Sequence, residues 1–134
     1  MSKELGDLLA EGAETETFTN DGTVAKGDAV AIDQSASGGD ITAANSGDTG
    51  TGEEFAGVCI NDGGGTDGDT VTVALSGRVL ANVASGVSGG NRGDVSATDG
   101  EIGASSGGPV LFLSDEGGSW KGESLGSGEG AVHF

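Results

Sequence analysis

This chain of 134 residues carries 22 acidic and only 5 basic side chains, a formal net charge of −17. The length suits one domain with a modest core. The charge argues against direct binding of DNA or RNA, which requires a basic face, and against an anionic membrane surface. The sequence shows no apolar run near the ~20 residues of a membrane span and no evident secretory signal. We therefore expect a protein made in the cytoplasm, without nucleic-acid or membrane partners.

Two explanations compete for the acidity. Intrinsic disorder is one, because low hydrophobicity with high net charge opposes a packed core. Life in very high salt is the other, because a Debye length of about 3 Å screens a dense acidic surface. Salt also strengthens apolar burial, so that Ala and Val can suffice for a core. The apolar residues are mostly Ala and Val, and the valines alternate in order, which favours a folded halophilic protein.

The chain is expected to begin with an arm over residues 1–13, followed by a single β domain over 14–134. In the arm, Leu5, Leu8 and Leu9 have the spacing of one apolar face of one or two helical turns. Such a helix is too short to be stable alone. The segment is therefore either a frayed terminus or an arm that orders against a neighbouring subunit, and the sequence leaves both open.

After the arm, the pattern is one of short strands punctuated by glycine. Apolar runs predict strands at 14–19, 27–33, 54–60, 69–76, 93–98, 108–114 and 130–134, with a short one at Ile41 inside a long loop over 34–53. This spacing is typical of an all-β protein, a small antiparallel β-barrel or sandwich with long Gly-rich loops.

The clearest alternation continues past Gly77 without a change of parity, from Val71 to Val83. A tight turn at Ser76–Gly77 between two strands would fit it. One long strand that bends at Gly77 would also fit, as strands do at barrel corners. Unbroken parity favours the bend.

A faint internal repeat places Gly-Asp just before a strand in segments 26–32, 67–73 and 91–97. Glycine supplies unusual backbone angles, and aspartate can accept hydrogen bonds from nearby backbone N–H groups. The sequence therefore predicts structural turns or bends at Gly27, Asp28, Gly68, Asp69, Gly77, Gly93 and Asp94.

The segment 61–69, "NDGGGTDGD", invites comparison with a calcium loop. An EF-hand loop needs alternating ligands and a Glu at its twelfth position, but counting from Asp62 the twelfth residue is Val73. The β-roll motif needs tandem copies, and only one imperfect copy occurs here. The segment is interpreted as a structural turn, and we predict no metal site and no cofactor.

Residues for catalysis are also scarce. His133 is the only histidine and Cys59 the only cysteine, so neither a Ser-His-Asp set nor a zinc cluster is indicated. Cys59 lies in an apolar run and is interpreted as a small core residue. Carboxylate pairs such as Asp115–Glu116 are expected on solvated surface, and the tripeptide "RGD" at 92–94 is attributed to chance. We predict no catalytic residues and no enzyme.

The segment "FAGVCINDGGGTDGDTVTVALSGRVLANVASGVSGGNRGDVSATDGEIG", together with the upstream "AKGDAVAID", resembles the small capsid decoration, or cement, proteins of tailed viruses with an HK97-type shell. The likeness covers residues 24–103. It implies a small β-barrel, usually trimeric, that binds the outer surface of the major capsid protein and stabilises the shell. With the acidic composition, it suggests a virus of haloarchaea.

On this hypothesis, the protein is a structural virion component on the capsid surface. The arm leucines, Leu5, Leu8 and Leu9, would dock on the shell. Candidates for the subunit interface are Val110, Leu111, Phe112, Leu113, Trp120 and Phe134. For Trp120, closure of the barrel is an equal alternative. The alternatives are a spike, fibre or cell-surface-layer β module of a halophile and, in third place, a small hydrolase that uses acidic side chains.

Overall fold

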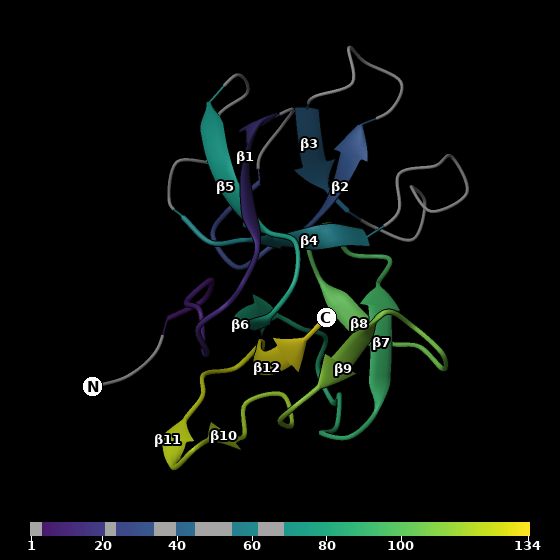
Figure 1. Ribbon diagram of the computed structural model, residues 1–134. Helices are drawn as coiled ribbons and strands as arrows, with labels where there is room; N and C mark the ends of the chain where they lie inside the picture. The colour runs from purple at the N-terminus through teal and green to yellow at the C-terminus, as the bar shows by residue number, and fades with distance from the viewer. Residues whose placement is uncertain (1–3, 21–23, 34–39, 45–54, 62–68) are drawn as a thin grey trace.

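The structure, a computed structural model, describes residues 4–20, 24–33, 40–44, 55–61 and 69–134. These residues form strands and no helix, which confirms the expected all-β class (Figure 1). The strands are β1 (Thr15–Asn20), β2 (Ala29–Asp33), β3 (Asp40–Ala43), β4 (Phe55–Cys59), β5 (Thr70–Ala74), β6 (Arg78–Asn82), β7 (Arg92–Val95), β8 (Ile102–Ala104), β9 (Val110–Phe112), β10 (Ser119–Trp120), β11 (Glu123–Ser124) and β12 (Glu129–His133).

The first five strands close into a barrel with the order β1-β3-β2-β4-β5. Side chains alternate along each strand, so every second apolar residue points into the barrel. The interior cluster is made of Phe18, Val24, Val30, Ile41, Cys59, Val71 and Val73. Neighbouring strands of the barrel run antiparallel, except that β1 and β3 run parallel. The predicted antiparallel barrel is therefore closed by one parallel strand pair.

The remaining long strands form a second sheet with the order β6-β12-β9-β7-β8, below the barrel in Figure 1. The C-terminal strand β12 lies inside this sheet, between β6 and β9. A parallel bridge between Val83, which follows β6, and Ile102 of β8 joins the two edges. This bridge and the hydrogen bond from the Ala84 N–H to the Ile102 carbonyl, at 2.8 Å, bring the two edges of the curled sheet together at one point. The closed barrel and this curled sheet are called here the two rings.

The two rings repeat one topology. Strands β6, β7, β8, β9 and β12 of the second ring correspond to β1 to β5 of the barrel. In each ring the first strand pairs antiparallel with the fifth and meets the third in a parallel arrangement. The second strand lies between the third and the fourth. The hairpin β10–β11 is an insertion before the fifth strand of the second ring. Of the three Gly-Asp segments, 26–32 and 91–97 fall on the second strand of each ring, whereas 67–73 leads into a fifth strand. The sequence repeat thus marks equivalent strands in two cases of three.

The chain passes from one ring to the other at Gly77. β5 and β6 belong to different sheets, so Ser76–Gly77 is not a hairpin turn. The chain does bend here, over residues 75–77, but between two separate strands and not within one long strand as predicted. Gly77 has φ of +116°, and a Cβ there would lie 2.9 Å from the Cβ of Ala13. Its N–H donates to the Phe134 carbonyl at 2.9 Å, and the Phe134 N–H donates back at 3.0 Å. The bend is therefore fixed by two hydrogen bonds to Phe134 and by close packing against Ala13.

One apolar cluster joins the two rings. Small side chains on the outer faces of barrel strands, including Ala29, Ala31 and Ala74, are fully buried against the second sheet. That sheet contributes Val79, Ala81, Val83, Val95, Ile102, Val110, Phe112 and Val132. Successive side chains of β2 therefore enter two different cores: Val30 lies inside the barrel, and Ala29 and Ala31 lie in the cluster between the rings. Cys59 is fully buried in the barrel, as predicted for a small core residue.

The predicted turns meet different outcomes. Gly27, with φ of +93°, and Asp28 precede β2 as expected, and Asp69 directly precedes β5. Gly68 lies outside the described residues. The turn predicted at Gly93–Asp94 is wrong, because both residues lie within β7, where Gly93 lets the ring of Phe112 approach: a Cβ there would lie 2.5 Å from Cζ.

The helix predicted for the arm is also wrong. Residues 4–7 form a turn, in which the Asp7 N–H donates to the Glu4 carbonyl at 3.0 Å, and Leu8 then forms an antiparallel bridge with Val79 on the edge of β6 that does not pair with β12. The Gly6 N–H donates to the Leu80 carbonyl at 2.6 Å, and the Leu9 N–H donates to that of Arg78 at 2.8 Å. An edge strand offers unpaired N–H and C=O groups to any extended segment, and this opportunity overrides the weak helical spacing.

Candidate interaction surfaces

Strand β9 divides the predicted interface residues between its two faces. Val110 and Phe112 are fully buried in the cluster that joins the rings, which leaves them no surface to offer to another chain. Leu111 and Leu113 point the other way and are half-buried. Val110 and Phe112 are therefore excluded as subunit-interface residues, and Leu111 and Leu113 remain candidates.

The two predicted aromatic candidates occupy different places. Phe134 packs edge-on against Phe55, with ring centroids 5.2 Å apart, at the margin of the shared core. Trp120 lies in the β10–β11 hairpin, which Figure 1 shows at the end of the second sheet remote from the barrel. The alternative that Trp120 closes the barrel is therefore wrong. Lys121 and Gly122 at the hairpin tip have positive φ, and the Lys121 ammonium lies 5.3 Å from the indole centroid.

The predicted arm leucines all lie beside β6. Leu8 is the one large hydrophobic side chain found exposed among the described residues, at 38 %. Leu5 packs closely on Gly27, because a Cβ on that glycine would lie 2.7 Å from the Cβ of Leu5. The Asp7 carboxylate pairs with Lys26 at 3.2 Å. The arm is thus seated on its own chain and presents Leu8 outward, while its contact with a shell stays a prediction.

The Asp115–Glu116 pair does more than solvate the surface. Asp115 Oδ1 accepts a hydrogen bond from the Gly89 N–H at 2.8 Å. The two carboxylate oxygens of Glu116 accept from the N–H groups of Gly86, at 3.3 Å, and Gly128, at 2.8 Å. Charge-assisted bonds of this kind are stronger than neutral ones. Asp115 is exposed and Glu116 partly buried, as expected for a surface pair, and their hydrogen bonds also link the glycine-rich loop after β6 to the start of β12.

Asp28 occupies the junction between the two rings. Its Oδ2 accepts from the Ala25 N–H at 3.0 Å, and its Oδ1 accepts from the Asn82 side-chain amide at 3.4 Å. Its side chain also fills the space beside Gly100, where a Cβ would lie 2.6 Å from Cγ. Burial raises the pKa of this carboxyl above its ordinary 3.8, and the charge of Asp99 adds to the rise. The hydrogen bonds from Ala25 and Asn82 oppose it without cancelling it.

We expect Asp28→Asn to flatten the pH dependence of stability. Because the folded state holds the Asp28 proton more tightly than the unfolded state, the stability linked to this group is complete below about pH 3.8. It is lost as pH rises through the raised folded-state value. Urea unfolding at about pH 3 and about pH 7 should show the variant gaining stability relative to wild type at the higher pH. The exposed control Asp69→Asn should leave the difference between the two pH values unchanged. An Asp28→Asn penalty equal at both pH values would contradict the expectation.

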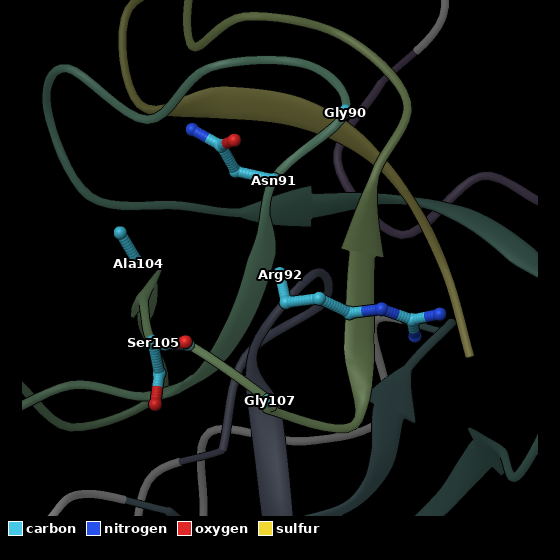
Figure 2. A pocket seen from close by; sticks show the side chains of 7 residues that line it. Gly90, Asn91, Arg92, Ala104, Ser105 and Gly107 are labelled. Atoms are coloured by element: carbon cyan, nitrogen blue, oxygen red, sulfur yellow. The ribbon is translucent and has the colours of Figure 1, made fainter.

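A surface pocket of about 470 Å³ opens at the edge of the second sheet. It is lined by Gly90, Asn91, Arg92, Ala104, Ser105, Ser106 and Gly107 (Figure 2). The lining contains hydroxyl, amide and backbone groups, and its only ionisable side chain is Arg92. In Figure 2 the Arg92 side chain runs away from Asn91 and Ala104 across β9. The pocket can offer hydrogen bonds, but its lining carries no carboxylate or imidazole to act as a base for either serine.

The "RGD" tripeptide is part of this edge. Arg92 is exposed, but Gly93 is buried in the middle of β7 and packs on Phe112. The tripeptide is therefore a piece of sheet and not a projecting loop. The acidic stretch that resembles a calcium loop, residues 62–68, lies outside the described residues.

Among the described residues, no group of three or more His, Cys, Asp or Glu side chains is placed to hold a metal ion. The same part of the chain contains no helix with the length and apolarity needed to cross a membrane. A scan against protein-family models finds no match, and a search of curated proteins finds none either.

Proposed function

We propose that this protein is a capsid decoration protein that binds the outer surface of an HK97-type shell by surface complementarity. The observation that carries the proposal is the placement of the family-like segment. Its "AGV" lies in β4, and "GDTVTVALSGRV" runs from the entry of β5 through the bend at Gly77 into β6. The motifs that suggest the family are thus the ones that build the barrel and its junction with the second ring.

The arm gives the proposal a point of contact. Leu8 is exposed on a segment that is already fixed against β6 by its bridge to Val79. A preorganised apolar side chain loses little entropy on binding, so it suits an anchor on a shell. The major capsid protein would be the partner. As the resemblance suggests, the protein would act as a homo-oligomer, a trimer, on the virion surface of a halophilic virus.

We expect the purified protein to co-sediment with empty, undecorated shells of its own virus in molar salt. Leu8→Asp should weaken this binding by about tenfold, because it places a charge at an apolar contact. The matched control Ala97→Asp introduces the same charge at an exposed residue outside the arm, and should bind normally if circular dichroism shows it folded. Absence of co-sedimentation of the folded wild type at saturating concentration would refute the proposal. Binding of Leu8→Asp equal to that of the wild type would show that the arm does not contact the shell.

A further inference from the structure

Basic side chains are scarce in this chain, yet several lie in one row across the second sheet. Arg78 of β6 is paired with His133 of β12, and His133 is also paired with Leu111 of β9. Leu111 is in turn paired with Arg92 of β7. Directly opposed residues on neighbouring strands point to the same face. Two of the five Lys and Arg residues and the single histidine thus share a row with Leu111, here called the cationic row.

The cationic row lies on the outward face of the sheet. Arg78, His133 and Arg92 are exposed, and Leu111 is half-buried. With strands about 4.8 Å apart, the row is ~14 Å long. Figure 2 shows the Arg92 side chain crossing β9 along this direction. The ion pair found among the described residues is Lys26–Asp7, and no described carboxylate lies within 4.0 Å of a basic group in the row.

The composition of this face is that of a protein contact. Leu111 and Leu113 give it an apolar centre, and the two arginines flank Leu111 and His133 along the row. Interfaces combine an apolar core with a polar rim, and arginine is enriched among the residues that dominate their energy. The other face of the same strands is the core that joins the two rings. An acidic protein surface is the complementary occupant.

We propose that this face is the contact with a second copy of the chain, whose exposed carboxylates meet Arg78 and Arg92. Two molecules that each carry a net charge of −17 repel one another over most of their surfaces. At the cationic row, by contrast, Arg78 and Arg92 attract the carboxylates of a second molecule. Nucleic acid is a poorer occupant because the rest of the chain repels a polyanion. The inference rests on the homo-oligomer of the proposed function and names the surface that forms it.

The experiment is sedimentation of the full chain in molar salt over a range of concentrations. The wild type should self-associate. The double variant Arg78→Glu, Arg92→Glu should raise the dissociation constant by about tenfold or more, since attraction is replaced by repulsion at two positions within the contact, where salt screens charges much less than on an exposed surface. The neutral pair Arg78→Gln, Arg92→Gln should shift it in the same direction by less. Lys121→Glu, a single charge reversal at the hairpin tip outside the row, should change it less than about twofold and less than Arg92→Glu alone.

Two results would overturn the inference. One is a wild type that stays monomeric at every concentration. The other is a folded double variant, checked by circular dichroism, that associates as well as Lys121→Glu. A monomeric wild type whose binding to empty shells is lost in the double variant would assign the row to the capsid protein instead. Because shell binding is measured separately, failure of this contact and failure of the proposed function are distinguishable.

Discussion

Phe112→Ala is expected to lower the free energy of unfolding by about 3–5 kcal/mol. Among the residues that the structure describes, Phe112 is the largest fully buried side chain, and it lies in a shared core built mainly from alanine and valine. Its ring packs on the bare backbone of Gly93, so truncation leaves a cavity that rigid strands cannot close. Since domains are stable by only about 5–15 kcal/mol, the loss is a large share of the total.

Chemical unfolding in molar salt measures this change. Trp120→Ala is the matched control, because it also truncates an aromatic residue of the second half, but one that is half-exposed on the hairpin. It should cost about 1 kcal/mol or less. A Phe112→Ala penalty no greater than that of Trp120→Ala would show that the core between the rings does not hold the fold.

Transfer from molar salt to about 0.1 M salt is expected to destabilise the wild type by about 2 kcal/mol or more. This loss corresponds to a fall of roughly 10 °C in the unfolding midpoint. The Debye length grows from about 3 Å to about 10 Å over this range, so carboxylates that were screened begin to repel one another. The wild type carries 22 acidic residues against 5 basic ones. Thermal unfolding followed by circular dichroism at several salt concentrations gives the dependence.

A variant separates charge screening from the general strengthening of apolar burial by salt. Glu11, Glu14 and Glu16 are exposed and close together in the chain before and within β1. Replacing all three by glutamine should reduce the salt dependence if repulsion is its cause, and should leave it unchanged if burial is. A wild-type midpoint that does not move with salt would contradict the halophilic interpretation altogether.

Local patterning was sufficient to predict most strands. Val71 and Val73 alternate with threonine, and this period of two is incompatible with one apolar face of a helix. The bend at Gly77 could be predicted because parity persists through a residue that tolerates φ of +116°. β8 was missed because its apolar signal is essentially Ile102 alone. The β10–β11 hairpin was missed because each of its strands has two residues.

The candidate surfaces were less accessible from sequence. The sequence could not say which face of the apolar run 110–113 belongs to the core, and the structure buries Val110 and Phe112 while it leaves Leu111 and Leu113 half-buried. Arg78, Leu111, Arg92 and His133 are scattered over more than fifty positions, and only strand pairing aligns them. No local signal could have found the cationic row.

The sequence by itself determined that this is an acidic all-β protein with valine-rich strands, glycine turns and a chain bend at Gly77. These features depend on residue type and on a period of two, which act over a few neighbouring positions. The tertiary structure alone decided that the halves repeat one ring topology, that the arm pairs with β6, and that Gly93 makes room for Phe112. Each of these depends on contacts between residues distant in the chain, whose free energy comes from burial and edge pairing that no short segment encodes.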